Sequence, residues 1–513
     1  MARSVPRLPA AARFARPLRT GLTCAFTLLL AACSAPASKR PRADAAATAR
    51  IEAIAKDEQP YSRLPDGRVR LPSRGEFELD HEDSRNLYVR IYPAARSALR
   101  AEDATGAGSP SFVVPSGNRL VAVDIGDGLP RAGQWRDRFA VGDAVGDGTV
   151  QAVFTPPRKS GGTPLAFRRI GLRWERAALN IPAGPWDYGG VAIADVDGDG
   201  RNDLLLGMHL TGFSALLARG DGYERRDDGL PQRARHDFAG SGYALAALPA
   251  AAGSPADVIL LREAPGTLPT DRVAPGLATY RWSSTRFTAT PIADGRITGR
   301  DLAFAASHGD CPAKLAVASD AAAPAFVFER TGDGSWQARG LDGILTGYMT
   351  TDTVSLAASE LARCGALAVS YRVLEGQRWH VRLDLLLDDG NAWRRVPLFD
   401  RDTRTAITAT TFVASTERSP PRLIAIDAEG TMRVFDLADD TPSLVYEAIA
   451  PDWRRGCAGS DVHVLDTSDD GRFSAIAGFA GEPTMTRFDR CRAGGGVDAW
   501  RFEPTSAPPP AGR

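Results

Sequence analysis

The sequence lacks a net charge. Its 513 residues include 62 lysines and arginines and the same number of aspartates and glutamates. Nucleic acid and acidic membrane surfaces attract basic proteins, so this balance gives no electrostatic reason to expect either as a partner. We therefore expect no nucleic-acid partner. With 43% apolar residues, the chain can still bury a large core.

Catalytic motifs are missing as well. There is no Gly-x-Ser-x-Gly, no His-Glu-x-x-His and no phosphate-binding glycine loop. The six histidines are scattered without metal or triad spacing: His81, His209, His236, His308, His380 and His463. We therefore expect a protein that is not an enzyme.

Long apolar runs are confined to the N-terminus. Basic residues from Arg3 to Arg19 precede the apolar run 21–30, which ends in Leu30-Ala-Ala-Cys33. This ending resembles a bacterial lipobox and implies a lipoprotein signal peptide over residues 1–32 and a lipidated Cys33. A cleaved secretory signal is the alternative. Ser34 after the cysteine implies, by resemblance to enterobacterial sorting, the outer membrane. No other apolar run reaches the roughly 18 residues that span a bilayer.

Both ends of the remaining chain lack apolar periodicity. Residues 33–70 are rich in Pro, Ala, Ser and Arg, which cannot build a core, so we expect a flexible tether there. Residues 506–513 contain three consecutive prolines and are expected to be a disordered tail. The folded domain is expected to cover residues 71–505.

One loop concentrates acidic residues. Four carboxylates fall within nine residues and would repel one another in a regular element: Asp195, Asp197, Asp199 and Asp203. Calcium takes six to eight oxygens, and a loop turning at Gly200 can point alternate side chains inward. We predict that these carboxylates and the backbone carbonyl of Arg201 bind calcium. An EF-hand has a bidentate glutamate at the twelfth position of its loop. Here that position is Leu206, so the loop is not an EF-hand. A metal-free acidic hairpin is the alternative.

The loop Asp195-x-Asp197-x-Asp199-Gly200-x-x-Asp203-Leu204, preceded by Tyr188-Gly189, resembles the FG-GAP/VCBS repeat. Proteins of this family include integrin α-subunit heads and bacterial surface proteins. The resemblance implies an all-β propeller in which the loop holds calcium between two strands of a blade. It implies no reaction.

Related segments recur along the chain. They start at positions 143, 195, 249, 306, 358, 414 and 466, which are 52–57 residues apart. Apolar runs, Gly/Asp/Asn turns and aromatic residues between them predict hairpins, so each repeat suits a four-stranded blade. A weaker unit begins at Glu78. Counting it gives eight blades, which we favour; seven is the alternative if these strands only complete another blade.

The recurring loops differ in their ligands. The loop at Asp143 keeps Asp147 but has Val145 and Gln151 at the other two places. The loop at Asp466 keeps Asp470, with neutral serines at 468 and 474. We expect one firm calcium site, at Asp195, and two weak or vacant ones.

Four cysteines lie beyond Cys33: Cys311, Cys364, Cys457 and Cys491. They allow three pairings. Cys311 and Cys364 occupy adjacent places in corresponding loops of neighbouring repeats, and the other two bracket the last repeat. We therefore predict the disulfides Cys311–Cys364 and Cys457–Cys491 and an oxidising compartment. A zinc site is the alternative, but no Cys-x-x-Cys supports it.

Trp186, Asp187 and Tyr188 precede the acidic loop and could line a ligand groove, since aromatic residues are enriched at interfaces. Packing between blades is the alternative.

Together these features predict a lipid-anchored, monomeric propeller of the cell envelope, stiffened by calcium, that binds a protein or glycan without catalysis. Because propellers of this repeat type also resemble calcium-dependent polysaccharide lyases and certain lectins, a glycan-active enzyme or lectin is the alternative.

Overall fold

The structure is a computed structural model. It describes the backbone of five N-terminal strands and residues 119–505, with gaps at 132–134, 136–137, 158–161, 233–243, 249–253, 263–275, 294–296, 320–324, 342–354, 376–377, 403–404, 418, 439–441, 449–455, 481–490 and 492–494. The predicted signal peptide, Cys33 and the predicted tail at 506–513 lie outside the described residues. Within the described part of the chain, no helix is long and apolar enough to cross a membrane.

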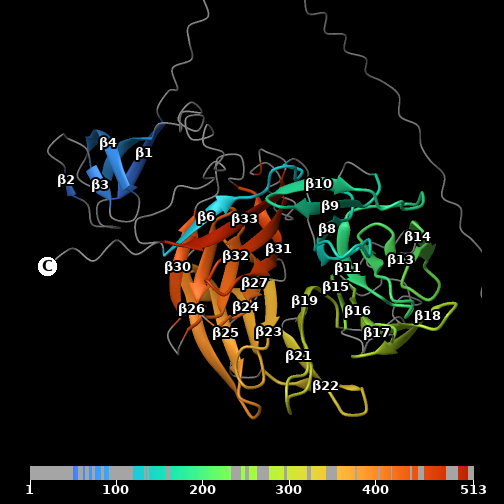
Figure 1. Cartoon of the computed structure of the whole chain (residues 1–513). Helices are drawn as coiled ribbons and strands as arrows, with labels where there is room; N and C mark the ends of the chain where they lie inside the picture. Colours follow the sequence, from blue (N-terminus) through green and yellow to red (C-terminus); the bar gives the residue numbers. More distant parts are fainter. Residues whose placement is uncertain are drawn as a thin grey trace, which may run out of the picture.

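The described residues from 119 onwards form seven four-stranded antiparallel sheets arranged as blades around an axis (Figure 1). Blade 1 comprises β7(Ala140–Gly142), β8(Gln151–Phe154), β9(Leu165–Ile170) and β10(Arg173–Ala177). Blade 2 comprises β11(Gly189–Ala194), β12(Asp203–Met208), β13(Gly212–Arg219) and β14(Gly222–Arg226). Blade 3 comprises β15(Ala244–Ala247), β16(Val258–Leu261), β17(Leu277–Trp282) and β18(Phe287–Pro291). Blades 4 and 5 comprise β19(Gly299–Ala305), β20(Lys314–Ser319), β21(Phe326–Arg330) and β22(Trp336–Arg339); and β23(Ser355–Ser359), β24(Ala366–Glu375), β25(Arg378–Asp388) and β26(Trp393–Asp402). Blades 6 and 7 comprise β27(Ile407–Val413), β28(Arg422–Asp427), β29(Met432–Asp436) and β30(Ser443–Ala448); and β31(Ala458–Thr467), β32(Phe473–Ala480), β33(Gly496–Pro504) and β6(Leu120–Asp124).

The predicted repeats match these blades. Each predicted start falls within two residues of the end of a blade's first strand, as at Asp143 after β7 and Asp195 after β11. The first strands contact one another in succession, from β7·β11 to β27·β31, and therefore form the inner wall of the propeller. The prediction of an all-β propeller with four-stranded blades is confirmed.

The favoured count of eight blades is corrected to seven, the alternative. The last blade is completed by β6, which pairs with β33 from Trp500↔Asp124 to Pro504↔Leu120. This pairing joins the two ends of the propeller chain and closes the ring. One N-terminal strand is therefore incorporated into blade 7, instead of a whole N-terminal sheet forming another blade.

The unit predicted at Glu78 belongs to a separate five-stranded sheet. Its order is β1-β5-β4-β3-β2, and none of its strands pairs with a described propeller strand. The strands are β1(Arg50–Ala55), β2(Ser62–Arg63), β3(Val69–Leu71), β4(Gly75–Glu82) and β5(Asn86–Ile91). The sheet thus draws on both the predicted tether and the first residues assigned to the propeller.

The core lies between neighbouring blades. All six residues of β12 are buried, and alternate side chains point to opposite faces of a strand. Leu204 and Leu206 pack with Val153 of blade 1, whereas Leu205 packs with Leu260 of blade 3. A continuous apolar run is therefore needed where a strand is covered on both faces.

The structure contains both predicted disulfides. Cys311 and Cys364 connect the first loops of blades 4 and 5, with 5.2 Å between their Cα atoms. Cys457, just before β31, bonds to Cys491, which precedes β33, with 4.4 Å between the Cα atoms. The predicted pairing is confirmed, and disulfides indicate an oxidising compartment outside the cytoplasm.

Candidate metal site

The acidic loop connects the two inner strands of blade 2. Ala194 at the end of β11 pairs with Asp203 at the start of β12. The chain between them turns at Gly198 (φ 78°) and Gly200 (φ 86°), a left-handed conformation that L-residues with a Cβ rarely adopt. These glycines let the loop fold back so that its first and last aspartates lie close together.

Asp195 holds the loop in shape. Its Oδ1 accepts hydrogen bonds from the backbone N–H groups of Gly198 (2.7 Å) and Asp199 (3.2 Å), and its Oδ2 accepts one from Gly200 (2.9 Å). Short aspartate side chains commonly bond to the backbone of the next few residues in this way. The first acidic residue therefore organises the backbone in addition to facing the metal position.

Asp203 anchors the loop to the blade. Its side chain is fully buried, and its two oxygens accept the backbone N–H groups of Val196 (2.8 Å) and Ala218 (2.7 Å). The pKa of the Asp203 carboxyl is raised to about 7, chiefly by burial and to a smaller extent by the charges of Asp197 and Asp199, while its two backbone hydrogen bonds oppose the shift. A nearby cation would favour the charged form of this carboxyl.

Three of the predicted carboxylates come together. Ligand oxygens of Asp195, Asp197 and Asp203 lie within 4.8 Å of one another. An all-oxygen set of hard donors suits calcium or magnesium more than zinc or copper, which favour imidazole and thiolate. These three residues, the acidic trio, fit a metal ion, and a divalent cation there would neutralise charges that the fold holds side by side.

The fourth carboxylate, Asp199, lies outside the trio. Its Oδ2 faces Arg201 (3.1 Å) and Arg219 (3.1 Å), and Arg219 also pairs with Asp197. Arg201 further donates to the backbone oxygen of Ala218 (2.8 Å). Asp199 and the Arg201 carbonyl as ligands stay predictions. The sequence reasoning missed Arg219, although a basic residue beside a β-turn in the same repeat was the available signal.

The corresponding loop of blade 1 has the same backbone. The Oδ atoms of Asp143 accept the N–H groups of Gly146 (2.7 Å), Asp147 (3.1 Å) and Gly148 (2.9 Å). Gln151 takes the place of Asp203, and its Oε1 accepts the N–H of Ala144 at 2.5 Å. This loop keeps its shape with only two carboxylates, and within the described residues it forms no metal-ligand cluster.

The corresponding loop of blade 7 has a different shape. The strand pairing continues through Asp466↔Ser474 to Thr467↔Phe473, so the turn is shorter. Asp466 forms an ion pair with Arg169 of blade 1. Asp466 is thus engaged by another blade, which removes the first ligand of a metal loop.

Basic residues occupy the position of Asp203 in two further blades. Lys314 opens β20 opposite Ala305, and Arg422 opens β28 opposite Val413. The buried Nζ of Lys314 lies 2.7 Å from the carbonyl oxygen of Cys364 and 3.0 Å from Oδ2 of Asp388. In blade 4, an ammonium group therefore binds oxygens at the place where blade 2 gathers carboxylates.

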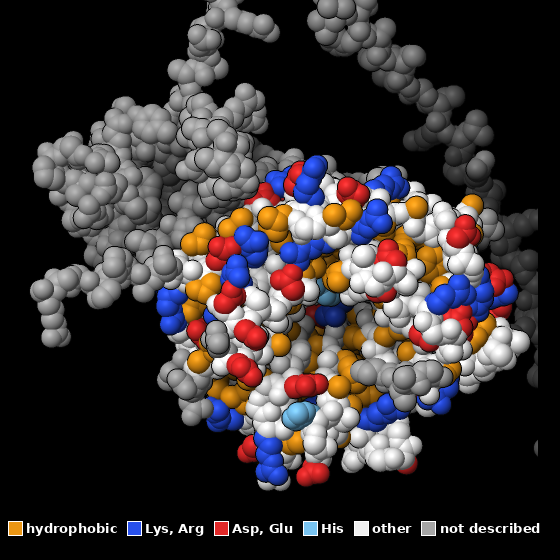
Figure 2. Space-filling model, in the orientation of Figure 1, with side chains coloured by type: hydrophobic (Ala, Val, Ile, Leu, Met, Phe, Trp, Pro, Cys, Tyr) orange, Lys and Arg blue, Asp and Glu red, His pale blue; other side chains and the backbone are white. Residues whose placement is uncertain are grey.

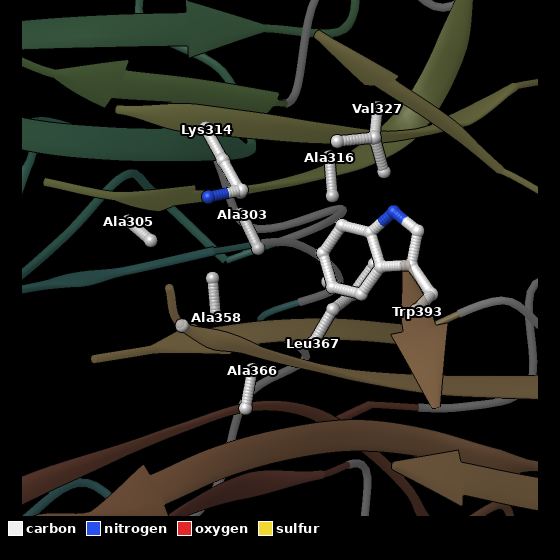
Figure 3. A pocket seen from close by; sticks show the side chains of 10 residues that line it. Ala303, Ala305, Lys314, Ala316, Val327, Ala358, Ala366, Leu367 and Trp393 are labelled. Carbon is white, nitrogen blue, oxygen red and sulfur yellow. The ribbon is translucent and has the colours of Figure 1, made fainter. Parts of the chain in front are cut away.

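A small cavity adjoins Lys314 between blades 4 and 5. Apart from Lys314 and Trp393, mainly small side chains line it (Figure 3). Its volume of about 10 Å³ is near the lower limit for a cavity that can hold one water molecule. The cavity is too small for an organic ligand, so it offers no second site.

The residues of the predicted groove have unequal exposure. Trp186 is buried, donates its Nε1–H to the Pro182 carbonyl at 3.0 Å and lies beneath the guanidinium of Arg225. Asp187 and Tyr188 are half-buried, and the Tyr188 ring stacks on His209. Trp186 thus packs in the core, as the alternative predicted. A groove at Asp187 and Tyr188 stays a prediction.

Comparisons with known proteins identify no family. No family model matches the chain, and no curated protein matches it. A crystal structure of a protein from Lactobacillus plantarum is similar at 12% sequence identity and a TM-score of 0.39, over 61% of this chain and 85% of that one. The strand order and the acidic trio of the described residues define the class: a seven-bladed β-propeller with a candidate metal site in blade 2.

Proposed function

We propose that this chain is a calcium-stabilised propeller that acts as a non-enzymatic binding module for a protein or glycan at the cell envelope. The observation that carries the proposal is the acidic trio, which gathers three carboxylates at one end of blade 2. Calcium is the ion of choice because extracellular calcium modules use carboxylate and carbonyl oxygens in flexible loops. Its role is to stabilise the fold, since the trio lies in a strand connection and not in a cavity.

The envelope location has two supports. The two disulfides support an oxidising compartment, where such bonds form and persist. The sequence Leu30-Ala-Ala-Cys33 resembles a lipobox, and a lipid on Cys33 would keep the propeller at the outer membrane. Labelling cells with a fatty-acid analogue tests this: wild type should be labelled and Cys33→Ser should not. Label retained by the variant would contradict the anchor.

Thermal unfolding of the purified chain tests the calcium proposal. Calcium should raise the melting temperature relative to chelator, and magnesium should raise it less, because magnesium gives up its waters reluctantly. Asp197→Ala should remove most of the calcium response. Asp147→Ala in blade 1 is the matched control and should leave the response intact. Equal melting temperatures of the wild type in calcium and in chelator would refute the proposal.

A glycan-active enzyme is the second candidate, and one observation favours it. His463 on β31 lies with Nε2 2.8 Å from Oδ2 of Asp461, the arrangement of a histidine base oriented by a carboxylate. Incubation of the full chain with polysaccharides, followed by product analysis, separates the two candidates. Release of products by the wild type but not by His463→Gln would establish the enzyme.

A further inference from the structure

The inner wall of the propeller contains a charged cluster that the metal site does not use. Arg138, two residues before the start of β7 in blade 1, forms an ion pair with Asp301 on β19 of blade 4. These blades are not neighbours in a ring of seven, so the ion pair crosses the central channel. Asp461 and His463 of β31 complete what we call the channel-mouth cluster.

The channel-mouth cluster lies toward the face opposite the acidic trio. Arg138 precedes its inner strand, and Asp301 is the third residue of β19, whereas the metal loop follows the end of β11. The inner strands run in the same direction around the axis, so their first residues share one end. The space-filling view shows a hollow at the centre of the ring, with basic and histidine side chains inside it (Figure 2).

Neighbouring blades hold the cluster in place. Asp301 accepts the backbone N–H of Leu356 of blade 5 at 2.7 Å. Asp461 accepts the N–H of Phe139 at 3.1 Å, and the ring of His463 packs edge-on against Phe139, with 4.6 Å between centroids. The charged groups are therefore fixed by the fold, which reduces the entropy lost when a ligand binds.

The cluster retains unused hydrogen-bonding capacity. A guanidinium has five N–H donors, and the ion pair of Arg138 with Asp301 involves its Nη2. Among the described residues, the Oγ of Ser460, next to Asp461, is buried without a hydrogen-bond partner. Buried polar groups are rarely left without hydrogen bonds unless a ligand or water supplies them.

The charges restrict the chemistry of the ligand. One guanidinium faces two carboxylates, so the cluster has no excess of positive charge that would compensate a simple anion, and its guanidinium and imidazole donors disfavour a simple cation. A sugar hydroxyl both donates and accepts hydrogen bonds, which suits carboxylate acceptors beside guanidinium, imidazole and hydroxyl groups. We propose that the channel-mouth cluster binds an uncharged, hydroxyl-rich glycan, an inference that rests on the proposed function as a binding module.

Binding calorimetry on the full chain in calcium tests this site. The probes are maltohexaose, cellohexaose and chitohexaose, with an oligogalacturonate as the acidic comparison. At least one neutral sugar should bind, and Arg138→Gln or Asp301→Asn should weaken it about tenfold or more, as expected for loss of a hydrogen bond to a charged group. Arg173→Gln, which removes an exposed ion pair with Asp127, is the matched control and should bind like the wild type.

The outcomes separate this inference from the proposed function. Each variant is first melted, and His463→Gln serves as an additional variant that leaves the Arg138–Asp301 pair intact. Binding of no neutral sugar, binding of the acidic sugar alone, or equal weakening by Arg173→Gln would overturn the channel-mouth site. A calcium-dependent melting temperature without sugar binding would refute the site and leave the calcium-stabilised propeller standing.

Discussion

The first loops of blades 1 and 2 differ by a few side chains and share one backbone shape. Asp143 and Asp195 each accept three backbone N–H groups at the same relative positions. The glycines at relative positions four and six have positive φ in both: 73° and 77° in blade 1, and 78° and 86° in blade 2. The loop shape therefore does not require a full set of metal ligands.

The difference between the loops lies in the remaining carboxylates. Val145 replaces Asp197 and is exposed, while Gln151 replaces Asp203 and still accepts the N–H at the second loop position. The side-chain amide of Gln151 can therefore accept the hydrogen bond that Asp203 accepts in blade 2, without carrying a charge. Blade 2 therefore uses two additional carboxylates that the loop shape does not demand, which is the strongest argument that they serve a metal.

The largest expected effect comes from removing the buried anchor of blade 2. Asp203→Leu leaves the N–H groups of Val196 and Ala218 without an acceptor, and each such loss costs about 1–3 kcal/mol. Urea unfolding in chelator should show a loss of about 2–6 kcal/mol in the free energy of unfolding. Gln151→Leu in blade 1 should cost about half as much, because Gln151 anchors chiefly the N–H of Ala144. Equal losses would contradict the stronger anchoring in blade 2.

The next effect separates the shape of the loop from its ligands. Asp203→Gln gives blade 2 the anchor of blade 1, so the loop should fold in chelator while losing its response to calcium. In the wild type, calcium at 100 times its dissociation constant should add about 2.7 kcal/mol to the free energy of unfolding. Thermal unfolding with and without calcium checks this. A variant that still responds fully would show that Asp203 is not a ligand.

The reverse exchange should create a site in blade 1. Val145→Asp combined with Gln151→Asp restores the acidic positions on a backbone that already has the required shape. Calorimetric titration should detect a second bound calcium ion, with weaker affinity than the first, because nothing has selected the surrounding residues. Val145→Asn with Gln151 unchanged is the control, and it should bind only the first ion. Failure to gain a second ion would show that more than the loop is needed.

The smallest expected effect concerns the opposite end of blade 2. Burial raises the pKa of Asp187 to about 6 from an ordinary value of 3.8. The folded state therefore holds this proton more tightly than the unfolded state, so the contribution to stability is present below about pH 4 and is lost as pH rises through about 6. The stability of Asp187→Asn should depend less on pH across this window. Unfolding curves of the wild type and of the variant at several pH values measure the difference. The same dependence of stability on pH in both proteins would contradict the raised pKa of Asp187.

Local patterns in the sequence determined much of this protein. The 52–57-residue spacing predicted blades because each blade is a repeat of the same hairpins. The acidic trio was predictable because its members lie within nine residues of one another. The Cys311–Cys364 disulfide was predictable because the two cysteines occupy equivalent loops of adjacent repeats, and equivalent loops of adjacent blades are neighbours in the ring.

The tertiary structure alone decided what depends on residues far apart in the chain. The number of blades depends on β6 pairing with β33, more than 370 residues later, which no local pattern encodes. Arg219 reaches Asp197 and Asp199 because a hairpin places β13 beside the loop, and Arg138 meets Asp301 because the ring brings its inner strands around one axis. Repetition specifies which elements form, whereas closure of the ring specifies which side chains face one another across it.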